Sequence, residues 1–352
     1  GSLAPADPAG PPAPRHAMFA GEIVNPTEDR AAEHAAERGE GAADWVEEAE
    51  ALPERMRMLV EAMRGGAFGD IRSLIHIGIG GSALGPKLLI DALRRTAGRY
   101  EAAVVSNVDG AALEEAIRRF DPHSTLLVIA SKTFTTTETM LNAASALSWM
   151  EEHGVIDPYG RVVALTASPG KAVEFGVDET RILPFGETVG GRFSLWSSIG
   201  FPAALALGWD SFESLLEGAA AMDRHFRLAP LDANAPVVAA FADHYYPNLR
   251  GAATRAVFAY DERLRLLPDY LQQLEMESNG KSVRLDGAPA GRATAPVVWG
   301  GVGTDAQHAV FQLLHQGTHL VPVEFIASVA PGDALDPAHH RILLQNCFAQ
   351  GA

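Results

Sequence analysis

The chain has 352 residues, 47% of them hydrophobic and 20% charged, a composition typical of a globular protein large enough for two domains. Its 44 acidic residues outnumber 28 basic ones and give a formal net charge of −16, which disfavours nucleic acid and anionic membranes as partners. The single cysteine, Cys347, excludes a disulfide framework and a cysteine metal cluster, and it fits a reducing compartment.

The first part of the chain predicts an arm and then helices. No apolar run reaches the length of a membrane span and no signal peptide is visible, so we expect a cytoplasmic protein. Residues 1–18, rich in proline and alanine, predict a flexible arm. Residues 19–64 predict a helical segment, because apolar residues recur at spacings of three and four over 28–64.

Strands and helices then alternate in two series. The first series has predicted strands at 72–78, 102–106, 126–130, 161–165 and 181–183, and helices at 83–96, 111–120, 138–150 and 171–175. After a helical stretch at 194–227, the second has helices at 237–245, 264–274 and 309–315 and strands at 255–258, 297–299 and 321–326. Such alternation predicts mostly parallel sheets covered by helices on both faces. The fold class is therefore α/β, with two domains expected at 65–205 and 206–352.

A glycine-rich loop, IHIGIGGSALGP (75–86), joins the first predicted strand to a helix. Glycines let a backbone approach an anion closely, and a helix N-terminus offers free N–H groups. The pattern is close to G-x-G-x-x-G but ends on Ala83, so a dinucleotide site with Asn107 or Asp109 at the ribose is an alternative. A tight turn that binds nothing explains the spacing equally well.

The segment SKTFTTTET (131–139) follows the third predicted strand and consists mainly of hydroxyl residues around Lys132. Short hydroxyls, backbone N–H groups at a helix start and one ammonium together predict a phosphate cradle. A capped helix with a polar loop is the alternative. The position at the carboxyl end of a strand favours the ligand site.

Three charged or titratable residues stand out later in the chain. Arg192, in GGRFSLWSSIG, is either a buried ion-pair partner or a charge that stabilises a developing anion. Glu277 and His308 each have an ordinary structural explanation, as a surface carboxylate and as a hydrogen-bonded helix residue. His315 lies seven residues after His308, a poor spacing for a metal, and no HExxH motif is present. One carboxylate base with one histidine suits proton transfer on a sugar better than hydrolysis or redox chemistry.

Five motifs in this order resemble those of the phosphoglucose isomerase (glucose-6-phosphate isomerase) family: GIGGSALGP, SKTFTTTET, GGRFSLWSSIGFP, MESNGK and GTDAQHAVFQLLHQGT. The resemblance runs from about Phe19 to the end of the chain. It implies two sugar isomerase (SIS) domains, each a mostly parallel sheet flanked by helices, and a homodimer with shared active sites. It also implies interconversion of glucose 6-phosphate and fructose 6-phosphate through an enediolate, in glycolysis and gluconeogenesis, without a metal or redox cofactor.

The resemblance assigns roles to ten residues. Glu277 resembles the base that moves a proton between C2 and C1, Arg192 the residue that stabilises the enediolate, and His308 the ring-opening histidine that reaches in from the partner subunit. The phosphate cradle corresponds to Ser82, Ser131, Lys132, Thr133 and Thr136, and Gly81 and Gln273 correspond to substrate neighbours.

One feature of the family has no counterpart in this sequence. The family carries a C-terminal lysine in a GVELGK-like motif that helps to open the sugar ring, and no such motif occurs here. The second domain is therefore expected to be truncated at its C-terminus. The alternative function is a non-catalytic or weakly active sugar-phosphate-binding SIS protein.

Overall fold

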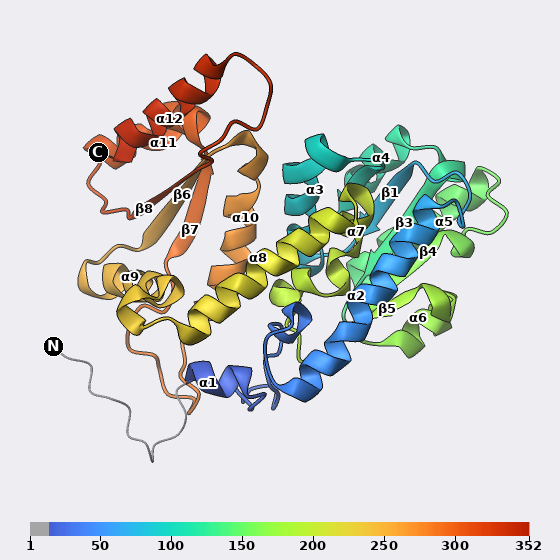
Figure 1. Ribbon diagram of the computed structural model, residues 1–352, viewed down its shortest axis with the longest axis horizontal. Helices are drawn as coiled ribbons and strands as arrows, with labels where there is room; N and C mark the ends of the chain where they lie inside the picture. The colour runs from blue at the N-terminus through green and yellow to red at the C-terminus, as the bar shows by residue number, and fades with distance from the viewer. Residues whose placement is uncertain (1–13, 352) are drawn as a thin grey trace. The chain divides into compact units, whose positions relative to one another are not determined.

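The computed structural model describes residues 14–351, which form two compact units, each with its own parallel sheet (Figure 1). Of the described residues, those up to Pro86 and Ala97–Pro230 form the first unit, and Lys87–Thr96 with those from Leu231 onward form the second. The arm expected at 1–18 lies largely outside the described residues, which begin with helix α1 (Pro14–Phe19). The domain boundaries expected from the sequence stay predictions.

The sheet of the first unit has five parallel strands in the order β2-β1-β3-β4-β5. These are β1 (Ser73–Ile77), β2 (Glu101–Val105), β3 (Thr125–Ala130), β4 (Val162–Thr166) and β5 (Ile182–Pro184). All residues of β1, β3 and β4 are buried, which explains their near-continuous apolar sequences. The predicted strands, the edge position of the last and the α/β class are confirmed.

Helices cover both faces of this sheet. Helices α4 (Gly110–Arg119), α5 (Thr137–Glu152) and α6 (Pro169–Phe175) supply residues to one core, with Ile75, Ile77, Leu127 and Ile129 from the strands. The alternate strand residues, including Leu74 and Leu126, are buried as well. Figure 1 shows α2 (Ala43–Arg64) and α7 (Phe201–Leu207) in front of the sheet, where they contact β5 and β1. The unit is completed by α8 (Trp209–Leu228), and α3 (Leu84–Ala97) follows β1.

The second unit has a three-stranded parallel sheet in the order β7-β6-β8, formed by β6 (Thr254–Tyr260), β7 (Val297–Val302) and β8 (Val323–Ala327). Its helices are α9 (Ala235–Leu249), α10 (Leu267–Gln272), α11 (Gly303–Gln316) and α12 (Pro337–Gly351), and Lys87–Thr96 of α3 also belongs to it. Figure 1 shows α11 and α12 on one side of these strands and α10 on the other. The core of this unit includes Phe258 and Tyr260 of β6, Phe311 of α11 and Cys347 of α12.

Three sequence predictions differ from the structure. Residues 28–39 do not form the expected α-helix. Arg30 pairs with Asn25 in an isolated antiparallel β-bridge, and Ala36–Arg38 forms a 3₁₀ turn. Strand β7 runs on through two glycines to Val302. Glycine suits position 300, because any side chain there would collide with the carbonyl of Val257 on the adjacent strand β6. Helix α11 consequently begins directly at Gly303, before the predicted residue 309. None of the helices within residues 14–351 has the length and apolarity needed to cross a membrane.

Candidate active site

The hydroxyl-rich loop lies at the carboxyl end of β3, between the buried strand and the start of α5. In a sheet of order 2-1-3-4-5, β1 and β3 flank the point where the chain reverses its direction of winding, the place where open α/β sheets bind ligands. Ser131 is 3% exposed, and its Oγ lies 3.0 Å from Oγ1 of Thr136, the residue that precedes α5. Hydroxyls and free helix N–H groups therefore converge there, as an anion site requires.

Phe134 fixes the shape of this loop. Its φ of +52° is unusual for a non-glycine residue, and its ring is 4% exposed within the core of the first unit. Burial of the ring holds the strained turn in place. The turn leaves Thr133 exposed, where its hydroxyl accepts a hydrogen bond of 2.8 Å from Thr135.

Lys132 is held by the segment that follows β5. Its Nζ donates to the carbonyl oxygens of Glu187 at 2.6 Å and Val189 at 3.2 Å. The ammonium has three protons, so one remains for an anion. Burial and the charge of Arg30, which donates to the same Glu187 carbonyl at 2.6 Å, lower the pKa of Lys132 to about 8. Two cations thus meet beside the loop, which supplies the local positive charge that an anionic substrate needs against a net charge of −16.

The glycine loop at the end of β1 is fixed by a buried histidine. His76 lies in the fully buried strand β1, and its Nε2 is 2.6 Å from the carbonyl oxygen of Ser82. Burial lowers the pKa of His76 to about 4, so the ring is neutral near pH 7 and Nε2 must carry the proton that it donates. The apolar run SLIHI contained the signal for this residue, a single polar side chain inside a buried strand.

Gly81 and Arg192 belong to segments that touch. A side chain at Gly81 would come within 2.2 Å of the Gly191 backbone and 2.5 Å of the Arg192 nitrogen, so only glycine fits there. Arg192 is half-buried in a 3₁₀ segment, Gly191–Trp196, with its guanidinium 5.0 Å from the Phe193 ring centre. The expected cradle residues of the first unit and Arg192 are therefore gathered around the ends of β1 and β3.

Glu277 and Gln273 lie on one segment of the second unit. After α10 the chain forms five residues of π-helix, Gln273–Glu277, a rare conformation that is frequent at functional sites. Gln273 Nε2 donates to Oε2 of Glu277 at 2.8 Å, and the Lys281 ammonium donates to the Glu277 carbonyl at 2.7 Å. The carboxylate is exposed and oriented, as a base that must reach a ligand has to be.

His308 lies on α11, five residues after the helix begins, and its side chain is exposed. The helix is anchored by neighbouring Gln307, which accepts a hydrogen bond of 3.0 Å from the Tyr260 hydroxyl. Within the second unit, a hydrogen bond joins Gln273 to Glu277, whereas His308 is placed on a different helix, α11. No three His, Cys, Asp or Glu side chains among residues 14–351 gather closely enough to hold a metal ion.

The fold and these sites define a class: an α/β protein with a hydroxyl-rich loop and a lysine at a strand end of the first unit, and an exposed carboxylate oriented by a glutamine in the second. Residues 6–352 match the family model described as phosphoglucose isomerase. The chain is 72% identical over 347 residues to a glucose-6-phosphate isomerase of Rhizorhabdus wittichii, covering 99% of this chain and 69% of that protein. It is 67% identical to the glucose-6-phosphate isomerase of Zymomonas mobilis, covering 96% and 67%.

Solved structures agree with these sequence matches. The crystal structure of a glucose-6-phosphate isomerase from Chlamydia trachomatis superposes with a TM-score of 0.87 at 31% identity, covering 96% of this chain and 68% of that one. A hypothetical protein from Thermus thermophilus gives 0.72 at 27% identity, covering 85% and 74%. The chain therefore belongs to the phosphoglucose isomerase family, and it spans about two thirds of the length of the relatives named here. The predicted family and fold class are confirmed.

Proposed function

We propose that the chain is an aldose–ketose isomerase that interconverts glucose 6-phosphate and fructose 6-phosphate, a step of glycolysis and gluconeogenesis. The observation that carries this proposal is the family match over residues 6–352, with 72% identity to a protein of that name across 99% of the chain. The alternative of a non-catalytic sugar-phosphate-binding protein finds no support among the relatives named above, and a dinucleotide site finds none either.

In this proposal the phosphate binds at the end of β3. The hydroxyls of Ser131, Thr133 and Thr136, the N-terminus of α5, the glycine loop at Gly81 and Ser82, and Lys132 together offer donors and positive charge. The phosphate takes no part in the bond changes. Its binding energy orients the sugar carbons, which lowers the entropic part of the barrier.

Proton transfer is assigned to Glu277. The carboxylate takes the proton from C2 of the open-chain aldose, and the C2–H electrons form the C1–C2 double bond of the enediolate while the negative charge moves to O1. The same carboxyl then returns the proton to C1, and the O2 hydroxyl proton passes to O1 as the C2 carbonyl forms. The hydrogen bond from Gln273 holds the carboxylate in one orientation. Arg192 stabilises the negative charge of the enediolate, and His308 transfers a proton during ring opening. No metal or redox cofactor enters these steps.

We further propose a homodimer with shared active sites in the cytoplasm. Exposure of His308 on α11 is compatible with a histidine that serves the partner subunit's site. Mixing the Glu277→Gln and His308→Ala variants tests this idea. Restored activity in mixed dimers supports sharing, whereas mixed dimers as inactive as both parents contradict it.

A coupled assay tests the activity itself. Fructose 6-phosphate is supplied, and glucose 6-phosphate formation is followed through a dehydrogenase that reduces NADP, with the Glu277→Gln protein as the matched control. Turnover by the unaltered chain alone supports the proposal. Binding of fructose 6-phosphate without turnover would instead establish the non-catalytic alternative, and binding of NAD would indicate a dinucleotide site.

A further inference from the structure

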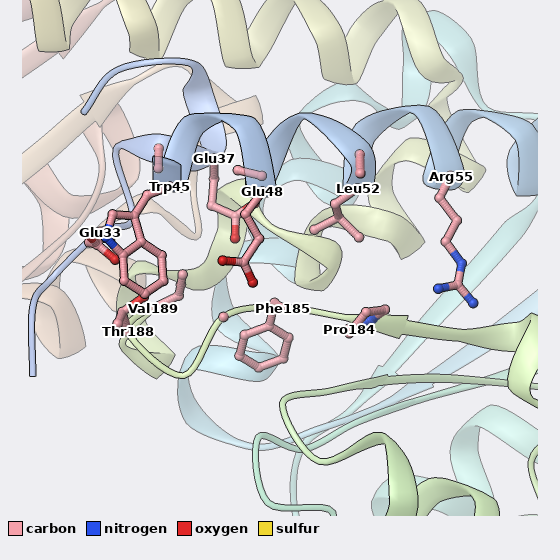
Figure 2. A pocket seen from close by; sticks show the side chains of 14 residues that line it. Glu33, Glu37, Trp45, Glu48, Leu52, Arg55, Pro184, Phe185, Thr188 and Val189 are labelled. Atoms are coloured by element: carbon pink, nitrogen blue, oxygen red, sulfur yellow. The ribbon is translucent and has the colours of Figure 1, made fainter. Parts of the chain in front are cut away.

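A cavity of about 230 Å³ lies within the first unit (Figure 2). It is open to solvent on one side and is lined by α2 from Trp45 to Arg55, the 3₁₀ turn at Ala36–Arg38 and the segment from Pro184 to Val189. Its apolar wall includes Trp45, Leu52 and Phe185. The cavity exceeds the roughly 150 Å³ that accommodates a benzene ring in a protein core. None of the residues expected to bind or convert the sugar lines it.

Three carboxyl groups line this cavity: Glu33, Glu37 and Glu48. Glu33 and Glu37 are 5% and 8% exposed, and Figure 2 shows Glu37 and Glu48 pointing toward the segment of Phe185. Oε2 of Glu37 is buried without a hydrogen-bond partner among the described residues. A ligand that brings an N–H or O–H proton to that oxygen would complete its hydrogen bonding.

The chemistry of the wall selects the kind of ligand. Three carboxyl groups repel an anion, and a neutral polyol would leave its hydroxyls against apolar side chains. The three carboxyl groups are not arranged to hold a metal ion, since no three His, Cys, Asp or Glu side chains among residues 14–351 form such a group. The carboxyl groups favour a positively charged ligand, and the apolar side chains favour a ligand with an apolar body. An organic cation with N–H groups has both properties, because carboxylates accept its N–H protons and an aromatic face attracts its charge.

We propose that this cavity binds an organic ammonium ion, with the N–H protons directed to Glu37 and Glu33 and the apolar body packed against Trp45 and Phe185. The site is separate from the proposed isomerase chemistry, so its test does not depend on turnover.

The affinity is expected to depend on pH. Burial raises the pKa of Glu33 and of Glu37 to about 7; Glu48 adds to both shifts, while Thr188 opposes the first and Arg38 the second. Arg55 is the cationic residue of the cavity wall. An alkylammonium stays protonated below a pKa of about 10. Ionisation of the two carboxyl groups should therefore strengthen binding between pH 6 and pH 8.

The experiment uses 2-phenylethylammonium and its neutral counterpart 2-phenylethanol, each titrated into the full chain at pH 8 by calorimetry. We expect the ammonium ion to bind at least about tenfold more tightly, since a tenfold ratio corresponds to one charge-assisted contact of about 1.4 kcal/mol. Glu37→Gln should weaken ammonium binding about tenfold and leave the alcohol unchanged. Glu47→Gln, an exposed change on α2 outside the cavity wall, should alter neither.

Equal binding of the two probes, no binding of either, or full ammonium binding by Glu37→Gln would each overturn the proposal. A second variant covers the case in which Glu37→Gln does not fold. Trp45→Leu should weaken ammonium binding more than alcohol binding, because it removes the aromatic face while keeping an apolar wall. Equal losses for both probes would remove the assigned role of charge and overturn the site.

Discussion

Gln273 donates a hydrogen bond of 2.8 Å to the carboxylate of Glu277, its neighbour at the other end of a single π-helical turn. An ordinary α-helix would place residues four apart on one face as well, but the wider turn changes where their side chains point. A base and the amide that orients it are therefore built into the same short segment. Mutating Glu277 and Gln273 separately can therefore distinguish the role of the base from that of the amide that orients it.

Glu277→Gln should abolish proton exchange at C2 while phosphate binding persists. The amide keeps the size of the side chain but cannot accept the proton, and loss of a general base costs about 10²- to 10⁴-fold in rate. Solvent deuterium incorporation at C2, read by NMR, measures the step directly. Exchange at the original rate would show that another group is the base.

Gln273→Met should lower kcat by less, about 10- to 100-fold, because the base remains but is less well oriented. Combining this change with Glu277→Gln should add little further loss, since the amide acts through the carboxylate. The comparison requires kcat for both single variants and the double variant. Fully additive losses would mean that Gln273 acts on the substrate independently of Glu277.

Lys132→Ala should raise KM more than it lowers kcat, because a phosphate contact is nearly equal in the ground and transition states. The pKa of Lys132 is lowered to about 8, so the ammonium is lost as pH rises through 8 and kcat/KM should fall there. Lys132→Arg keeps the charge to far higher pH and should remove this alkaline fall. An unchanged KM in the alanine variant would reject the cradle role.

Much of the fold was predictable because strands β1, β3 and β4 of the first sheet are buried apolar runs, and burial alone explains their sequences. The alanine spacing of residues 28–39 imitates a helix. Distant partners fix this part of the chain instead: Arg38 pairs with Asp223 at 2.6 Å, and Glu40, just after the segment, pairs with Arg224 at 3.0 Å. Such contacts join positions far apart in the chain and leave no periodic signal.

The candidate site, like the fold, was predictable from the sequence only in part. Hydroxyl density and strand-end position sufficed to predict the loop of Ser131 and Thr136. The carbonyl acceptors of Lys132 could not be predicted, since backbone oxygens of Glu187 and Val189 carry no residue-specific signal and lie in a segment more than fifty positions away. The π-helical turn at Gln273 was likewise invisible, because it is a rare departure from a pattern that reads as an ordinary helix.

His308→Ala should impair cyclic substrate more than an open-chain sugar phosphate that cannot close a ring. The histidine is assigned to proton transfer during ring opening, a step that the open-chain compound does not need. Turnover of both substrates by the variant and by the unaltered chain gives the comparison. His315→Ala, a change of a histidine on the same helix, serves as the control. Equal losses with the two substrates would rule out the ring-opening role.

His76→Leu should loosen the loop that carries Ser82 by removing the donor to its carbonyl oxygen. An unsatisfied buried carbonyl costs about 1–3 kcal/mol, so the free energy of unfolding should fall and KM for the sugar phosphate should rise.

The direction in which pH changes the stability contributed by His76 follows from its pKa of about 4 in the folded chain, below the ordinary value of 6.5. The stability contributed by the neutral ring is complete above pH 6.5 and is lost as pH falls toward 4. Urea unfolding at pH 7 and pH 5 should therefore show a smaller pH dependence in His76→Leu than in the unaltered chain, and no change in the exposed control His319→Leu. An identical pH dependence in all three proteins would mean that His76 does not hold the loop as a buried neutral donor.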